Sequence, residues 1–261
     1  MPLSESAAMK LTRVTYTIKQ SKLTIETDKP SSIKLAIQSI KRNRDLLEEY
    51  IRKNPEFLTS FEPLEVRDAP KIVNIMAEAA SEAGVGPMAA VAGALADLAV
   101  DAMLVEAKVA VVENGGEIAA NSDTPIVVGL LAGTSPLSGK IGFHLKPNDF
   151  PIGIGTSSGT VGHAISFGEA DAATIIADNA ALADAAATAV GNAVQGEDYE
   201  KSVQKGLETS EAIRGVRGSL IVRGEYAGMV GKLPQLVKIE GEAWRSLKNV
   251  QDYLPPKIKF I

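Results

Sequence analysis

The first part of the chain alternates apolar and polar positions in a way that predicts a hairpin followed by a helix. Residues 12–27 alternate in places and are rich in Thr, a pattern typical of two short strands joined near Gln20. Apolar side chains then recur at helical spacing from Ile33 to Ile51, until Asn54 and the proline after it end the pattern. We therefore expect a β-hairpin packed beside a long amphipathic helix.

The next segment predicts a loop and then two helices of different character. Residues 56–68 are rich in Pro and charge and are expected to form a connecting loop, with Asp68 as the N-cap of a helix that ends at Gly84. Residues 88–103 are almost all small and apolar, which predicts a buried helix whose backbone lies close to its neighbours.

From residue 105 onward the pattern predicts strands, interrupted by two helices. The expected strands are residues 109–112, 126–131, 140–146, 152–155, 173–177, 219–222 and 236–239, and the expected helices are residues 180–194 and 199–213. No repeat or low-complexity linker divides the chain. We predict a single α+β domain over residues 1–261, in which a mixed, mostly antiparallel sheet is packed with Ala-rich helices.

Composition excludes several kinds of chemistry. The chain has 261 residues with 27 basic and 32 acidic side chains, so its net charge is −5, and a basic surface for nucleic acid or anionic membrane is not expected. No cysteine is present and there are two histidines, which excludes disulfides, thiolate metal sites and protein persulfides. We expect a cytoplasmic protein that binds a small molecule, with no nucleic acid and no membrane as partner.

Two glycine-rich segments could surround a ligand. Residues 133–141 follow an apolar strand but lack the spacing and the hydroxyl that a P-loop requires, so an NTPase is not expected. The second segment, Thr156-Ser157-Ser158-Gly159, leads to His163 and offers hydroxyl and N–H donors suited to an anion or a carbonyl-rich ring. A plain Gly/Ser hairpin explains the same residues.

Two further motifs carry candidate acidic residues. The turn Asn114-Gly115-Gly116-Glu117 follows a strand and is also what an ordinary hairpin turn looks like. Asp184 and Thr188 are four residues apart on an expected helix, so both oxygens share one face and suit Mg²⁺ or Ca²⁺. The alternative for this pair is a carboxylate near a helix start and a hydroxyl bonded to its own turn.

In this order the motifs resemble those of the ApbE family of flavin transferases. The counterparts are the small-residue segment around Ala92 with Asp97, the turn 114–117, residues 156–159 with His163, the strand at 174–177, and the motif 183–189. A closer resemblance, in residues 86–94 and 157–163, is to an uncharacterised ApbE-like family of anaerobic archaea and bacteria. The resemblance implies an ApbE-like, T-fold-related domain.

The resemblance also implies a site. Asp184 and Thr188 would be the Mg²⁺ ligands near the pyrophosphate of bound FAD. The turn 114–117 and residues 156–159 would bind the cofactor, FAD or FMN. Residues of this chain depart from the flavin transferases at three places: Ala92 stands where they have a lysine, no Asp-Pro follows His163, and their N-terminal Met-Gly-Thr strand is missing.

Two classes of function stay open at this point. The first is Mg²⁺-dependent chemistry on a nucleotide-like, flavin-like or anionic metabolite, with His163 as acid or base, either as an FMN transferase or in the sulfur assimilation into cysteine and homocysteine with which the closer family is associated. The second is a flavin or metabolite-binding module without turnover. In both classes we expect Asp184 and Thr188 to face the same cleft as residues 114–117 and 157–163.

Overall fold

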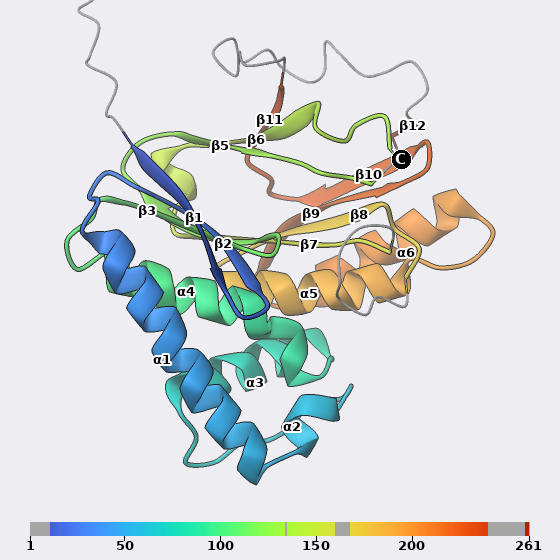
Figure 1. Cartoon of the computed structure of the whole chain (residues 1–261). Coiled ribbons are helices and arrows are strands. Elements are labelled where there is room, and N and C mark those ends of the chain that lie inside the picture. The colour runs from blue at the N-terminus through green and yellow to red at the C-terminus, as the bar shows by residue number, and fades with distance from the viewer. Residues whose placement is uncertain (1–10, 134, 160–167, 240–258, 261) are drawn as a thin grey trace, which may run out of the picture.

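The computed structural model describes residues 11–133, 135–159, 168–239 and 259–260, which form two sheets and a set of helices (Figure 1). The strands of the large sheet are β1 (Thr12–Ile18), β2 (Ser21–Thr27), β3 (Val109–Asn114), β4 (Glu117–Ser122), β7 (Ile152–Ser157), β8 (Ala172–Ala177), β9 (Val216–Arg223), β10 (Tyr226–Gly231) and β12 (Lys259–Phe260). The small sheet contains β5 (Ile126–Gly129), β6 (Ile141–Leu145) and β11 (Gln235–Lys238). The α-helices are α1 (Ser32–Lys53), α2 (Glu56–Thr59), α3 (Lys71–Ala83), α4 (Val91–Met103), α5 (Ala180–Ala193) and α6 (Tyr199–Ala212).

The large sheet has the strand order β1-β2-β3-β4-β7-β8-β9-β10-β12, and the small sheet has the order β11-β6-β5. Neighbouring strands are antiparallel except for β10 and β12, which are parallel. Sequential strands therefore pair mostly through hairpins, and helices connect those hairpins along one side of the sheet. The expectation of an α+β fold with a mostly antiparallel sheet is confirmed.

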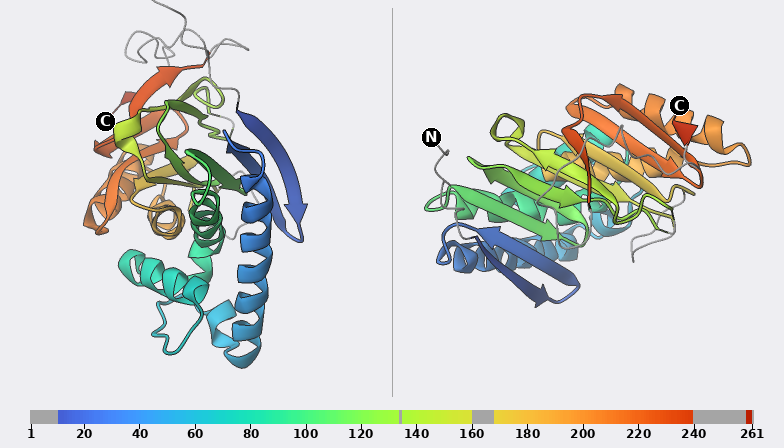
Figure 2. Two further views of the ribbon diagram at one scale, coloured as in Figure 1. Left: turned by 90° about the vertical axis from the view of Figure 1, so that its left-hand side faces the viewer. Right: turned by 90° about the horizontal axis from the view of Figure 1, so that it is seen from above.

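The large sheet is covered on both faces, as Figures 1 and 2 show. The helices lie against one side, which we call the helix face, and the small sheet lies against the other, which we call the cavity face. One core cluster on the helix face joins α3, α4, α5 and α6, and a second joins α1 and α4 to β2 and β3. A third cluster lies between the two sheets and includes Phe143, Ile154 and Ile176.

Most predicted elements form where the apolar pattern places them, with some differences. Residues 56–68 are not all loop, because α2 occupies the first four positions. Asp68 does not cap α3; it has a φ of +49°, and the helix begins at Lys71 after Pro70. Strands β4 and β10 were not expected, and each forms as the second strand of a hairpin against a predicted neighbour.

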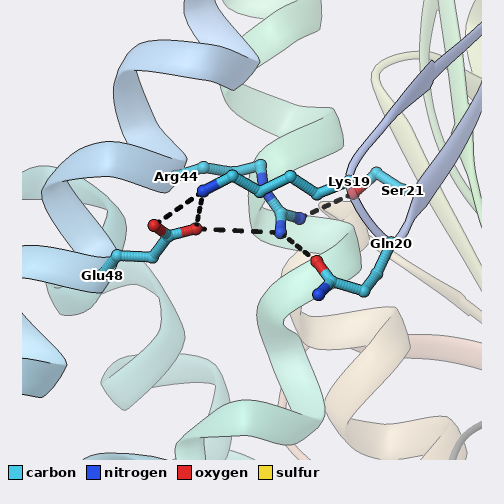
Figure 3. A network of polar contacts seen from close by, with 5 residues as sticks. All are labelled: Lys19, Gln20, Ser21, Arg44 and Glu48. Carbon is cyan, nitrogen blue, oxygen red and sulfur yellow. Dashed lines mark hydrogen bonds and ion pairs between the residues drawn. The ribbon is translucent and has the colours of Figure 1, made fainter.

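The turn between β1 and β2 is fixed to α1 by polar contacts (Figure 3). Arg44 of α1 donates to the side chains of Ser21 at 2.9 Å and Gln20 at 2.7 Å. Lys19 pairs with Glu48 one turn further along the helix, at 2.5 Å. These contacts hold the first hairpin at the edge of the sheet, next to the turn that follows β3.

No single helix in the described part of the chain is long and apolar enough to cross a membrane, although the bent pair Lys71–Ala83 and Pro87–Met103 together has the length and composition.

Candidate functional site

Strand β7 divides its side chains between the two faces of the large sheet. Ile154 and Thr156 line a cavity on the cavity face, as does Ser158, the residue after the strand. Gly155 faces α5, since a Cβ on it would lie 2.4 Å from the carbonyl oxygen of Ala183. The side chain of Ser157 also lies on this side, against Gly191 of α5. The predicted segment 156–159 therefore contributes to two separate surfaces, because successive residues of a strand point to opposite faces.

The turn between β3 and β4 has the geometry of a two-residue hairpin. Gly115 and Gly116 have φ values of +73° and +121°, which a residue without a Cβ adopts without strain. Asn114 and Glu117 are paired across the hairpin, and the Asn114 side chain donates to the Ala92 carbonyl of α4 at 2.9 Å. The interpretation as a hairpin turn is confirmed, and the turn is also anchored to the start of α4.

The backbone N–H groups of this turn are used within the protein. Gly115 donates to the Lys22 carbonyl at 3.2 Å, and Gly116 donates to the Glu113 side chain at 3.1 Å. The N–H of Gly159 likewise donates to the Ala170 carbonyl at 2.9 Å. These three glycines therefore do not offer the free N–H donors that an anion-binding loop needs.

Asp184 lies on the helix face, at the contact between α5 and α4. One carboxylate oxygen accepts the Gly93 N–H at 2.9 Å. Burial raises the pKa of Asp184 well above its ordinary value, and the negative charges of Glu117 and Asp97 raise it further. Gly93 makes this contact possible, because a Cβ there would lie 2.1 Å from the Ala180 carbonyl oxygen.

Two more carboxylates belong to this acidic cluster. Burial raises the pKa of Glu117 to about 7, and the charge of Glu113 adds to the increase. Burial also raises the pKa of Asp97 to about 6, although hydrogen bonds from the Ala180 and Ala181 N–H groups oppose this. Among the residues that the structure describes, no Lys or Arg forms an ion pair with Asp97, Glu117 or Asp184. No described cation therefore compensates the charge that these carboxyl groups carry when they are ionised.

A cavity of about 620 Å³ lies between the two sheets on the cavity face. Gly115, Gly116, Thr156 and Ser158 line it, so two of the predicted motifs meet there. Asp184 is not among the lining residues; it lies behind the turn, on the helix face, in the same cluster as Glu117. The motifs therefore converge at one end of the interior strands β3, β4 and β7, but from both faces of the sheet.

Sequence reasoning missed part of this cavity. The first hairpin contributes polar and charged side chains, and the small sheet contributes an apolar wall. The unforeseen lining residues include Arg13, Lys22, Thr24, Glu26, Val128, Phe143 and Thr174. Their alternation in the sequence indicates which face of a strand they share, but only the strand order places them opposite residues 154–158.

A second cavity of about 650 Å³ lies on the helix face, between α3, α4 and the start of α5. Its lining includes Asp97, Asp101 and Asn179. None of the site residues predicted from the sequence lines it, which is why we place the candidate site at the other cavity.

The acidic cluster fits a hard divalent cation in the chemistry of its donors. Asp184 and Glu117 supply carboxylate oxygens in a desolvated setting, which suits Mg²⁺. Within residues 11–133, 135–159 and 168–239, no three His, Asp or Glu side chains lie close enough together to hold a metal by themselves. Hydroxyl, carbonyl or ligand oxygens would have to complete the shell. Thr188 is partly buried one turn beyond Asp184, and His163 lies outside the described residues.

Comparisons with known proteins agree with the motifs. A family model described as "AbpE bacteria" matches residues 5–210. The UPF0280 protein of Methanococcus vannielii is 46% identical over 236 residues, which cover 89% of this chain and 95% of that protein. The UPF0280 protein of Methanothermobacter thermautotrophicus is 47% identical over 199 residues, which cover 76% of this chain and 77% of that protein.

Solved structures of ApbE proteins share the fold. The flavinyl transferase ApbE of Pseudomonas stutzeri has a TM-score of 0.53 at 14% identity, covering 86% of this chain and 95% of its own. The ApbE protein of Thermotoga maritima has a TM-score of 0.52 at 16% identity, covering 81% and 94%. The family model and the nearly full-length relatives together establish that this chain belongs to the UPF0280 family of ApbE-like proteins.

Proposed function

We propose that this protein binds a flavin-like or nucleotide-like small molecule in the cavity between the two sheets, together with a divalent cation at Asp184. The observation that carries the proposal is the position of the hairpin turn after β3. Gly115 and Gly116 line the cavity, while Asn114 and Glu117 on either side of them belong to the helix face, beside Asp184. A ligand in the cavity could therefore extend an anionic group around this turn toward the cation.

The cavity walls suit a planar ring. Ile118 and Ile154 of the large sheet line one side, and Val128 and Phe143 of the small sheet line the other. Apolar walls on two sheets, with a few hydroxyl groups near the end of β7, are typical of pockets for aromatic ligands. The hydroxyls of Thr156 and Thr174 lie 3.0 Å apart and would orient polar atoms on the ring.

The cation would be held by Asp184 and Thr188, with Glu117 close by. When bound there it would neutralise the carboxylates and a phosphate of the ligand. Among described residues, the exposed cavity cations Arg13 and Lys22 form no ion pair with a carboxylate, so they support an anionic ligand as well.

Features of the site point in different directions on whether the protein catalyses a reaction or only binds its ligand. The shared fold and the motif around Asp184 favour an Mg²⁺-dependent transferase of FMN. Ala92, in place of the lysine of the flavin transferases, favours a carrier that binds without transfer. A role in sulfur assimilation stays a prediction, and a protein without cysteine would have to fill it without forming a persulfide.

Calorimetric titration of FMN, FAD and AMP, with and without Mg²⁺, tests the binding proposal. We expect at least one of these ligands to bind more tightly with Mg²⁺, and Asp184→Asn to remove the Mg²⁺ effect while the fold persists. Asp198→Asn is the matched control, because Asp198 is the exposed N-cap of a different helix, α6. Absence of binding by all three ligands to the wild type would contradict the proposal.

A cavity-filling variant tests the location. Val128→Trp adds an indole between the two sheets and should abolish ligand binding, whereas Val105→Trp, at a side chain that is 82% exposed, should not. Repeated release of AMP from FAD, at more than one equivalent per protein, would show that the protein is a transferase or hydrolase. A single equivalent would show one round of FMN transfer or hydrolysis, and no release of AMP, with tight binding, would show a carrier.

A further inference from the structure

Helix α4 has no capping side chain at its own start. Its N-cap position is Ala90, the last residue of the 3₁₀ helix Pro87–Ala90. The Met88 carbonyl of that helix accepts the Val91 N–H, and no side chain of this segment caps the N–H groups that follow. The N–H of Gly93 is instead satisfied by Asp184, which reaches across from α5. Asp184 therefore acts as the N-terminal cap of a helix to which it does not belong.

Helix α5 is capped in the same way from α4. The two carboxylate oxygens of Asp97 accept the N–H groups of Ala180 and Ala181 at 2.9 and 2.8 Å. The helix's own N-cap, Asn179, satisfies only the next donor, Leu182, at 2.8 Å. With Asp97 in place, the first three N–H groups of α5 each have a side-chain acceptor.

The two contacts form a reciprocal pair. Asp97 lies four residues after Gly93, and Asp184 lies four residues after Ala180, so each helix offers to the start of the other an aspartate one turn beyond its own residue at the contact. The helices touch at Gly93 and Ala180, where no Cβ would fit on Gly93. In the same first turn of α4, the Ala92 carbonyl accepts a hydrogen bond from the Asn114 side chain.

We propose that Asp97 is a positioning residue for Asp184: by capping α5 from α4, it fixes where the Asp184 carboxylate lies against the first turn of α4. A carboxylate that uses both oxygens on consecutive N–H groups restrains sliding as well as rotation of α5 along α4. The two caps lie at opposite ends of the contact between α4 and α5. If one cap is lost, the helices are held by the other alone and can rotate about it. The Asp184 carboxylate would then lose its fixed spacing from Asn114 and Glu117.

The effect of Asp97 on the cation rests on the proposed function, whereas its effect on the position of α5 does not. The test therefore has two readouts. The first is amide hydrogen exchange by NMR on the full chain, measured for Gly93 relative to Ile175 in the buried strand β8. The second is the affinity for Mg²⁺ alone. Asp97→Ala should speed Gly93 exchange about tenfold relative to Ile175, the factor equivalent to a cap contributing about 1.4 kcal/mol, and should weaken Mg²⁺ binding.

Asp97→Asn and a matched control complete the design. Asn keeps one acceptor oxygen, so the variant should rescue part of both effects and also serves if Asp97→Ala fails to fold. The control is Asp198→Ala, which removes an ordinary N-cap from α6, where the Asp198 carboxylate accepts the Lys201 N–H at 3.1 Å. It should change neither the exchange ratio nor Mg²⁺ binding.

An unchanged Gly93 ratio in both Asp97 variants would overturn the proposal, as would faster Gly93 exchange with unchanged Mg²⁺ affinity. If the wild type binds no Mg²⁺, the proposed function loses its cation, and the Gly93 ratio alone decides whether Asp97 positions Asp184.

Discussion

The two faces of the large sheet are built differently around the same ends of strands β3, β4 and β7. On the helix face, glycine and alanine let backbones approach so closely that a Cβ on Gly93 or Gly155 would overlap a carbonyl of α5. On the cavity face, the sheets leave about 620 Å³ between them, lined by apolar walls and a few hydroxyls. One face therefore fixes positions, and the other leaves room for a ligand.

The difference separates stability from binding. Substitutions on the helix face should change the free energy of unfolding and the geometry of the acidic cluster, because close-packed regions do not absorb added volume. Substitutions on the cavity face should change ligand affinity more than stability. Variants on the two faces should therefore differ in which of these two quantities they change.

The largest effect is expected for Gly93→Ala. Its Cβ would lie 2.1 Å from the Ala180 carbonyl oxygen, which is backbone and cannot rotate away, so α4 and α5 must separate. We expect the free energy of unfolding in urea to fall by about 3 kcal/mol or more. Gly129→Ala is the matched control on the cavity face, because its Cβ would meet only the flexible end of Ile239, at 3.2 Å.

Gly129→Ala should cost less than about 1 kcal/mol. Equal losses for the two variants would show that the faces do not differ in rigidity, and would contradict the comparison.

Sequence periodicity is sufficient for the elements whose apolar pattern is complete. The long helix α1 and the helix α5 are examples, because their patterns are uninterrupted over several turns. Strands β4 and β10 were missed because Glu117–Ser122 and Tyr226–Gly231 contain few β-branched residues; pairing with β3 and β9 forms them. The preference of individual residues for strand conformation cannot reveal a strand that forms because it pairs with a neighbouring strand.

The candidate site shows the same limit. The motifs identified Asn114, Glu117 and Asp184, which do gather at the start of α4. The separation of Thr156 from Ser157 onto opposite faces follows from the extension of β7 to Ser157, two residues beyond the predicted strand 152–155. The role of Asp97 depends on how α4 crosses α5, so no spacing within one helix could indicate it.

The pH dependence of stability is expected to be the next largest effect. The pKa of Asp97 is about 6 in the folded protein against 3.8 for the ordinary group, so the folded state holds this proton more tightly than the unfolded state. Its contribution to stability is therefore present below about pH 4 and is lost as the pH rises through 6. The loss is at most about 3 kcal/mol.

Asp97→Asn cannot titrate and should remove this part of the decline, as measured by urea unfolding between pH 4 and 8 without divalent cations. Glu117→Gln should act over the higher range up to about pH 7, where that carboxyl titrates. A decline between pH 4 and 6 that is identical in Asp97→Asn and the wild type would show that this carboxyl does not titrate there.

A smaller effect is expected where the turn meets α4. Asn114→Ala removes the 2.9 Å bond to the Ala92 carbonyl and should lower the free energy of unfolding by about 1–2 kcal/mol. Asn43→Ala is a control, since the Asn43 amide also donates to a helix carbonyl, but within its own helix α1. If ligand affinity falls with Asn114→Ala and not with Asn43→Ala, the anchored turn matters for binding as well as for stability.

The smallest effect is expected for Lys19 of the first hairpin, which Figure 3 shows beside Arg44, a cation with different surroundings. Lys19 and Glu48 are both about half exposed, so their ion pair is screened and Lys19→Ala should cost less than about 0.5 kcal/mol. Arg44 is 15% exposed and bonds the side chains of Ser21 and Gln20, so Arg44→Ala should cost more, about 1–2 kcal/mol, through lost packing and two unpaired partners. In urea unfolding, Arg44→Ala should therefore lower the free energy of unfolding more than Lys19→Ala does. In 1 M NaCl the loss caused by Lys19→Ala should shrink more than the loss caused by Arg44→Ala, because salt screens the exposed ion pair. The reverse ranking would mean that the surface pair, not the buried guanidinium, holds the hairpin against α1.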